Sequence, residues 1–208
     1  MNQSKLTIMA DSHGKNLSDL IHQRATVNVC SFVRSGANFN KVIEDVQQLT
    51  TDLTKNDYLL VIAGTNNVES TSVNRLMEDV HGLIRDSSHT NLILATLPMR
   101  HDKPKLDLKI SVINSKLEKE AKTDKFQILP LHILPRHYYT TQGMHYNKKG
   151  KVKIAEMIVK MLSKNIEQPT NQTSGLSPVI EEQGIHVIEQ DMGLIIDNFL
   201  YDSSVGFA

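Results

Sequence analysis

The sequence predicts an α/β fold, a three-layer α/β/α sandwich around about five parallel strands. Apolar runs of strand length alternate with segments of helical spacing five times along the chain. The runs are nearly continuous in apolar residues, which is typical of parallel strands covered by helices on both faces. A chain of 208 residues is also long enough to bury a full core.

Four runs have clear strand character and a fifth is weaker. They are "LTIM" from Leu6, "YLLVI" from Tyr58, "LILA" from Leu92, "FQILPL" from Phe126 and, more weakly, "VNVCSFV" from Val27. Cys30 lies in the weaker run, where we expect a buried and inert thiol. Because it is the single cysteine, no internal disulfide can form, and a reducing compartment is indicated.

Helical spacing of apolar residues occupies the segments between these runs. It covers residues 39–53, 73–84, 106–117 and about 148–162. The last of these segments carries four lysines, which we expect on its solvated face: Lys148, Lys149, Lys151 and Lys153.

Charge divides the chain near residue 165. All 23 Lys and Arg lie at or before Lys164, and seven of the 23 acidic residues lie beyond it, so residues 1–164 carry a net charge of +7. The stretch "NIEQPTNQTSGLSP" has the composition of a linker. We therefore expect one domain over residues 1–164 and an acidic, largely disordered linker and tail over 165–208. Docking of that tail on the basic domain or on a partner is an open alternative.

The sequence lacks the apolar segments of a membrane span and of a secretory signal. No run approaches about 18 apolar residues, the length of a membrane span, and the start of the chain has no apolar stretch of a secretory signal. With one cysteine in addition, we expect a cytoplasmic protein without a membrane span.

Several chemically capable residues follow the predicted strands. In open parallel sheets, ligands bind beyond the carboxyl ends of the strands, where these loops gather. The loop segments are Ser12 after the first strand, residues 35–36 after the second, 64–67 after the third, 100–102 after the fourth and 137–145 after the fifth. A hydroxyl, a glycine N–H, an amide and a histidine at one edge are the groups that acyl transfer needs.

Four short blocks in this order resemble those of the SGNH, or GDSL-type, hydrolases. The blocks are "ADSHG", "SGANF", "GTNN" and "QGMHYN", and the resemblance covers about residues 5–162. The stretch "LPLHILPRHYYTTQGMHYNKKGK" is most similar to SGNH-type domains of insect and retroelement-derived proteins. The resemblance implies a flavodoxin-like SGNH hydrolase fold.

The resemblance also assigns roles. It makes Ser12 the nucleophile and His145 the general base, and it forms the oxyanion hole from the N–H groups of Ser12 and Gly36 and the amide of Asn66. A helix that begins after Ser12 would add the positive end of its dipole. The implied activity is esterase-like cleavage of a carboxylic ester, without a cofactor.

Three positions depart from the family pattern. Ala10 replaces a glycine and Asn67 replaces an aspartate, both with mild expected effects. Gln142 stands where the family has the acid that orients the histidine, and in serine proteases the change of that acid to an amide lowers turnover about 10⁴-fold. Asp102, Gln142 itself or a backbone carbonyl could orient His145 instead. The alternative function is therefore a catalytically impaired binding module for a ligand, a protein or a nucleic acid.

Other ligands have less support. The nine histidines form no HExxH or similar pair, so we expect no metal. His13, His101 and His137 are candidates for lining a substrate pocket. No glycine loop for phosphate is present, and a nucleic acid is disfavoured because the positive charge is spread and aromatic residues are few. The ester substrate and the oligomeric state stay open.

Overall fold

The computed structural model describes residues 3–123 and 125–166, and within them a single parallel sheet of five strands. The spatial order is β2-β1-β3-β4-β5, and every neighbouring pair is parallel. The strands are β1 Lys5–Ala10, β2 Asn28–Val33, β3 Tyr58–Ile62, β4 Asn91–Ala95 and β5 Gln127–Leu129. All five predicted runs thus form strands, and the α/β prediction is confirmed.

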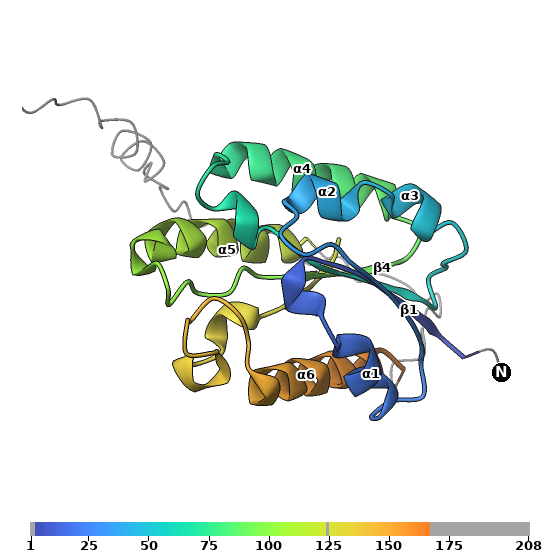
Figure 1. Cartoon of the computed structure of the whole chain (residues 1–208). Coiled ribbons are helices and arrows are strands. Elements are labelled where there is room, and N and C mark those ends of the chain that lie inside the picture. Colours follow the sequence, from blue (N-terminus) through green and yellow to red (C-terminus); the bar gives the residue numbers. More distant parts are fainter. Residues whose placement is uncertain (1–2, 124, 167–208) are drawn as a thin grey trace, which may run out of the picture. The chain divides into compact units, whose positions relative to one another are not determined.

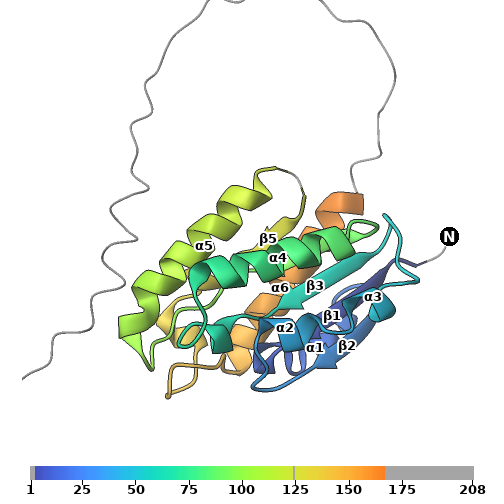
Figure 2. The same cartoon turned by 90° about the horizontal axis from the view of Figure 1, so that it is seen from above.

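Helices cover both faces of the sheet (Figures 1 and 2). One face carries α1 Leu17–His22 and α6 Lys148–Ile166; the other carries α2 Phe39–Ile43, α3 Val46–Leu49, α4 Val73–Asp86 and α5 Asp107–Ala121. Single 3₁₀ turns lie in the loops: η1 Ser12–Gly14, η2 Thr65–Asn67, η3 Pro104–Leu106, η4 Leu131–Ile133 and η5 Arg136–Tyr138. The described part of the chain is therefore a three-layer α/β/α sandwich.

Each face of the sheet has its own apolar cluster. Ile8 and Leu60 pack with Ile158 of α6 on one side, and Leu59 packs with Leu83 of α4 on the other. Successive strand residues point to opposite faces, so a strand covered on both sides must be apolar at every position. All five residues of the central strand β3 are buried accordingly.

The segment 39–53 forms two short helices instead of one. Asp45 separates α2 from α3 with φ −100° and ψ 20°. The guanidinium of Arg34 binds the carboxylates of Glu44 and Asp45 at this point. These charge-assisted contacts stabilise the break, which apolar spacing alone does not reveal.

Strand β2 lies at the edge of the sheet, and this corrects the prediction for Cys30. Its burial alternates along the strand, so that Cys30 and Phe32 are exposed. The prediction of a buried thiol was wrong because β2 is an edge strand, and the side chains on one side of its pleat face solvent.

The turn after β1 folds back closely over the end of the strand. A Cβ added at Gly14 would lie 2.2 Å from the Cβ of Ala10 and 3.6 Å from the side chain of Val33. Position 14 therefore has to be glycine as long as position 10 carries a methyl group, because no unstrained contact is that short.

Replacing Gly14 by alanine should lower the free energy of unfolding by about 1–3 kcal/mol, the usual cost of overpacking. Ala10→Gly in the same chain should restore part of it, because it removes the clashing methyl. Urea unfolding of both variants measures this. Gly82→Ala in α4 is the matched control, since its nearest neighbour is a flexible Arg85 nitrogen at 3.8 Å. A Gly14→Ala protein as stable as wild type would contradict the described packing.

The predicted linker and acidic tail fall almost entirely outside the described residues. The boundary near residue 165 and the docking of the tail therefore stay predictions. Among residues 3–123 and 125–166, no helix has the length and apolarity needed to cross a membrane.

Candidate active site

Ser12 lies in the tight turn that follows β1. Asp11 continues the strand through a hydrogen bond from its N–H to the carbonyl of Ile62 (2.9 Å), and Ser12 then starts η1. The carboxylate of Asp11 caps this turn by accepting the N–H of His13 at 2.8 Å. Ser12 is thus held by strand β1 on one side and by a capped turn on the other.

The prediction that a helix begins directly after Ser12 and adds its dipole there was wrong. The turn that begins at Ser12 has three residues, and α1 starts only at Leu17 and is six residues long. Asn16, with φ 63°, separates the two. A single turn aligns few peptide dipoles, so the support for a negative charge at Ser12 must come mainly from individual N–H groups.

His145 lies in a hairpin-like loop just before α6. Tyr139 and Tyr146 form an antiparallel bridge, and the N–H of Thr140 donates to the carbonyl of His145 at 2.8 Å. Asn147 secures the base of the loop, because its amide donates to the carbonyls of His137 and Tyr139 and accepts the N–H of Gly150 in α6. The main chain of His145 is therefore fixed, although no acidic side chain among the described residues binds its ring.

The two segments meet through their rings. The ring of His145 lies beside that of His13, the residue after Ser12, with a centroid distance of 5.3 Å. No hydrogen bond joins the Ser12 hydroxyl to the His145 ring within the described residues. Burial lowers the pKa of His145, and the neighbouring His13 and Lys151 lower it further. His145 is consequently disposed to be the neutral imidazole that a general base requires.

Gly36 and Asn66 lie in adjoining loops at the same edge of the sheet. The Asn66 amide donates to the carbonyl of Ala37 at 2.8 Å, so it holds the loop that contains Gly36. Gly36 has φ 76°, a conformation that favours glycine, and an added Cβ would meet nothing within 4 Å. Within the described residues, the N–H groups of Ser12 and Gly36 have no hydrogen-bond partner, so they are free to donate.

Asn67, which replaces an aspartate of the family pattern, is built into this loop pair. Its side-chain oxygen accepts the N–H of Phe39 at 2.7 Å, and its nitrogen donates to the hydroxyl of Thr71 at 3.1 Å. An ionised aspartate could keep both contacts, but the second would then have to be donated by the Thr71 hydroxyl, because a carboxylate only accepts. The substitution therefore alters loop support and leaves Asn66 in place.

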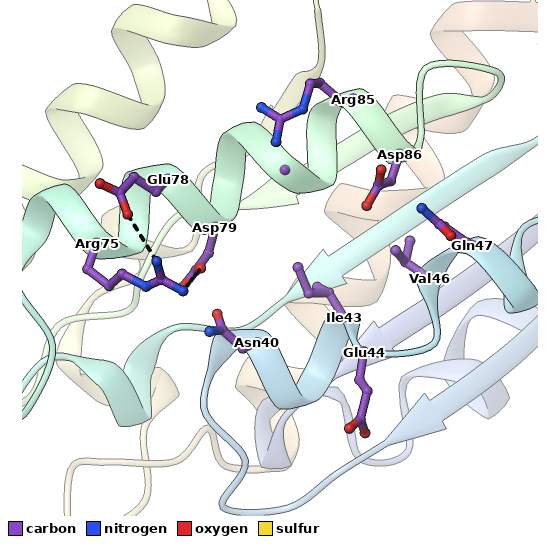
Figure 3. Close-up of a pocket in the computed structure, with 11 residues that line it drawn as sticks. Asn40, Ile43, Glu44, Val46, Gln47, Arg75, Glu78, Asp79, Arg85 and Asp86 are labelled. Carbon is purple, nitrogen blue, oxygen red and sulfur yellow. Dashed lines mark hydrogen bonds and ion pairs between the residues drawn. The ribbon is translucent and has the colours of Figure 1, made fainter.

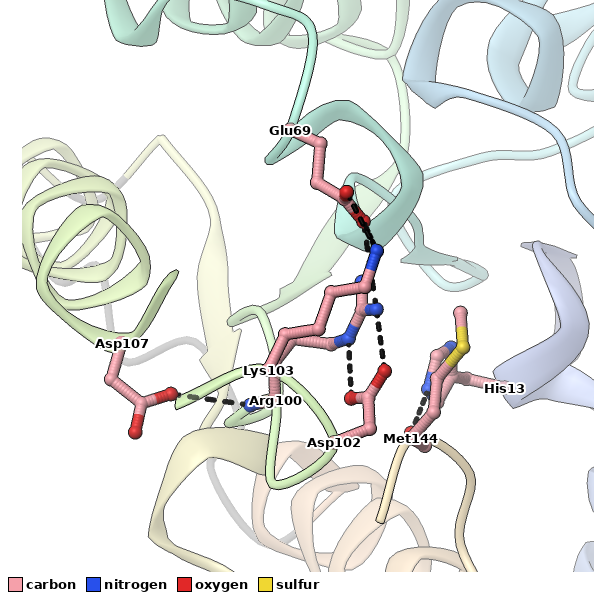
Figure 4. Close-up of polar contacts among 7 residues, drawn as sticks. All are labelled: His13, Glu69, Arg100, Asp102, Lys103, Asp107 and Met144. Carbon is pink, nitrogen blue, oxygen red and sulfur yellow. Dashed lines mark hydrogen bonds and ion pairs between the residues drawn. The ribbon is translucent and has the colours of Figure 1, made fainter. Parts of the chain in front are cut away.

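Asp102 is engaged by a different partner from the one considered in the sequence analysis. Its carboxylate accepts both Nε and Nη2 of Arg100 at 2.7 Å, a bidentate pair (Figure 4). Arg100 is almost fully buried and also faces Glu69 at 3.6 Å, and Glu69 binds Lys103. The hydrogen bonds from Arg100 hold the pKa of Asp102 below its usual range. Asp102 is thus an ionised acid whose side-chain hydrogen bonds, among the described residues, come from Arg100.

Gln142 is exposed, and its side chain makes no hydrogen bond within the part of the chain that the structure describes. The loop next to it is braced by Arg136, whose guanidinium donates to the carbonyls of Thr140 and Thr141 at 2.7 Å. Among the described residues, no side chain of any kind hydrogen-bonds the His145 ring. The roles of Asp102 and Gln142 in orienting it therefore stay predictions.

Three residues matter more here than the sequence indicated. His13 and Asp11 form a buried pair at 2.8 Å between Nδ1 and Oδ1. Lys151 was expected on a solvated face, but it is largely buried and its ammonium donates to the carbonyl of His13. Burial lowers the pKa of Lys151 to about 8. In the sequence, the only sign of the Asp11–His13 pair is that the two residues flank Ser12. For Lys151 the helical periodicity was misleading, because it predicted a solvent-exposed side chain.

A groove of about 580 Å³ lies elsewhere, between α2, α3 and α4 (Figure 3). Its charged side chains are largely paired: Arg75 contacts Glu78 at 3.1 Å and Asp79 at 3.4 Å. Burial raises the pKa of Asp79. The lining includes neither Ser12 nor His145 and has no hydroxyl or thiol side chain, so this groove is not the candidate active site. Within the described residues no cluster of three or more potential metal ligands is present.

Solved structures share this fold. A GDSL-like lipase from Bacteroides thetaiotaomicron is 17% identical with a TM-score of 0.64, covering 78% of this chain and 89% of its own. A member of the lipolytic G-D-S-L family from Veillonella parvula is 14% identical with a TM-score of 0.66, covering 77% and 99%. A psychrotrophic esterase from Pseudoalteromonas sp. is 13% identical with a TM-score of 0.62, covering 80% and 100%.

The chain therefore has the fold of the GDSL-type lipolytic proteins, as the sequence blocks predicted. At these identities the likeness establishes the fold alone. No protein-family model matches the sequence. No curated protein matches it either.

Proposed function

We propose that the chain is a serine hydrolase that cleaves small carboxylic esters through an acyl-enzyme. The observation that carries this proposal is the position of the His145 ring beside the turn of Ser12, at the sheet edge where free N–H groups of Ser12 and Gly36 also lie. Ligands of open parallel sheets bind at this edge. An acetyl xylan esterase and a peptidoglycan O-acetyltransferase with this fold make a short acyl group the first substrate to test.

In the proposed reaction the Ser12 hydroxyl attacks the ester carbonyl while its proton passes to His145. The carbonyl oxygen becomes negative and accepts hydrogen bonds from the N–H groups of Ser12 and Gly36, with the Asn66 amide as third donor. His145 returns the proton to the leaving alcohol, which leaves an acyl group on Ser12. A water then gives a proton to His145 while its oxygen bonds to the acyl carbon. The bond from that carbon to Ser12 breaks, the carboxylic acid leaves, and His145 returns the proton to the Ser12 oxygen.

A standard esterase assay tests the proposal. We expect the folded protein to hydrolyse p-nitrophenyl acetate faster than longer acyl chains, at a modest rate because Gln142 provides no acid for His145. A folded protein that releases no p-nitrophenol above the buffer rate from any acyl chain length would contradict it.

The pH dependence follows from the position of His145. Its pKa lies below the usual 6.5 because the ring is partly buried and faces His13 and Lys151. A lowered pKa keeps the base unprotonated to lower pH, so the acid limb of kcat/KM should have its midpoint below 6.5. A pH series of initial rates measures it. A midpoint at or above 6.5 would mean that His145 is not the titrating base.

A binding module is the second candidate, and one observation favours it. The His145 ring has no hydrogen-bond partner among the described residues, whereas catalytic imidazoles are normally fixed by a third group. In that case the same edge of the sheet would bind an acylated ligand without turnover.

The cytoplasmic location and a docking role for residues 165–208 are further proposals.

A further inference from the structure

His13 connects the serine turn with the histidine loop. Its Nδ1 lies 2.8 Å from Asp11 Oδ1. Its Nε2 lies 3.1 Å from the carbonyl oxygen of Met144, the residue before His145 (Figure 4). The carbonyl of His13 in turn accepts the ammonium of Lys151 in α6. One residue therefore binds three segments: the end of β1, the His145 loop and the first turn of α6.

The partners of the His13 ring determine its protonation. A backbone carbonyl can only accept, so Nε2 must carry a proton. Oδ1 of Asp11 already accepts the backbone N–H of His13, and it lies where it can also accept a proton carried by Nδ1. With both nitrogens donating, these contacts have the geometry of an imidazolium beside a carboxylate. Both side chains are buried, as a closely paired ion couple can be.

The contacts of His13 are close in sequence to the position where the resemblance predicts an acid that orients His145. The position three residues before His145 holds Gln142, whose side chain makes no hydrogen bond in the described part of the chain. The His13–Met144 bond instead fixes the main chain next to His145, and the capped turn fixes the main chain of Ser12. The spacing between the two segments is thus set through the ring of His13.

We infer that His13 is a positioning residue of the Ser12–His145 pair, a buried imidazolium that joins the two segments and lies against the His145 ring as a positive charge. The inference rests on the proposed function for its catalytic meaning, but its structural part is independent of catalysis. The other charged groups around His145 are Lys151, Lys15 and Asp11, of which only Asp11 is negative. Removing the charge of His13 should therefore make His145 easier to protonate.

Nuclear magnetic resonance of the histidine rings in the full chain tests this without any substrate. Long-range ¹H–¹⁵N spectra distinguish an imidazolium from each neutral tautomer. In the wild-type protein at neutral pH we expect both nitrogens of His13 to be protonated. A neutral His13 ring would overturn the inference, and this measurement needs no variant to fold.

His13→Gln adds a second test. In the folded variant, the titration midpoint of His145 should move to higher pH, since a positive neighbour is gone. The control is His22→Gln at the exposed end of α1, which should leave that midpoint unchanged. An unchanged midpoint in a folded His13→Gln protein contradicts the inference.

Kinetics of the same variants give the catalytic readout. If the chain is an esterase, His13→Gln should lower kcat about 10- to 100-fold and change KM little, because geometry is lost and no substrate contact is. An equal loss in His22→Gln, or a change confined to KM, would contradict the positioning role. If no ester is cleaved at all, the proposed function fails, and the ring spectra still decide the state of His13.

Discussion

Gln142→Asp is expected to raise kcat by about 10²–10⁴-fold. An acid at this position would accept the Nδ1–H of His145, hold the productive tautomer and stabilise the imidazolium formed as Ser12 attacks. The expected range follows from the about 10⁴-fold loss that the reverse change causes in a serine protease. Steady-state kinetics with p-nitrophenyl acetate measure it, with KM expected to change little.

The same variant should move the acid limb of kcat/KM to higher pH, because a new negative charge beside His145 raises its pKa. Thr141→Asp, an exposed neighbour in the same loop, is the matched control and should not raise kcat.

The effect of Gln142→Asp also tests the role of Asp102. If Asp102 already orients His145, Asp102→Asn will lower kcat and Gln142→Asp will add little. With Asp102 bound to Arg100, we expect Asp102→Asn to retain kcat.

Ser12→Ala and His145→Ala should each lower kcat by at least about 10³-fold, to the level of a binding surface without a nucleophile. Their effects should not add, because serine and histidine act as one unit in proton transfer. Ser12 is partly exposed and makes no side-chain hydrogen bond in the described part of the chain, so Ser12→Ala should keep wild-type stability. Urea unfolding checks this alongside the rates, and residual hydrolysis near the wild-type rate in either variant would contradict the assignment.

The sheet and most helices could be predicted from the sequence because their causes are local and repetitive. Strands buried on both faces, such as β3, are apolar at every residue, and α4 repeats its apolar residues every three or four positions. The same reasoning failed at Cys30, since an apolar run does not reveal that β2 is an edge strand. It also missed the break between α2 and α3, which depends on Arg34 from another loop.

The candidate site was predictable only as a set of loop positions. Order along the chain and the rule for parallel sheets place Ser12, Gly36, Asn66 and His145 at one edge. The contacts that decide their chemistry join distant residues, as the bond between His13 and Met144 does across 131 positions. Lys151 shows the same limit, because periodicity gives the face of a helix but not the carbonyl that draws one long side chain inward.

Covalent labelling of Ser12 tests the central claim most directly. A fluorophosphonate reacts with a serine hydroxyl that a neighbouring base and oxyanion donors have activated, and peptide mass spectrometry then locates the modified residue. We expect the modification at Ser12 in the wild-type protein, weaker labelling in His145→Ala and none in Ser12→Ala. A folded wild-type protein with no label at Ser12, or labelling that persists unchanged in Ser12→Ala, would contradict the claim that this chain is a serine hydrolase.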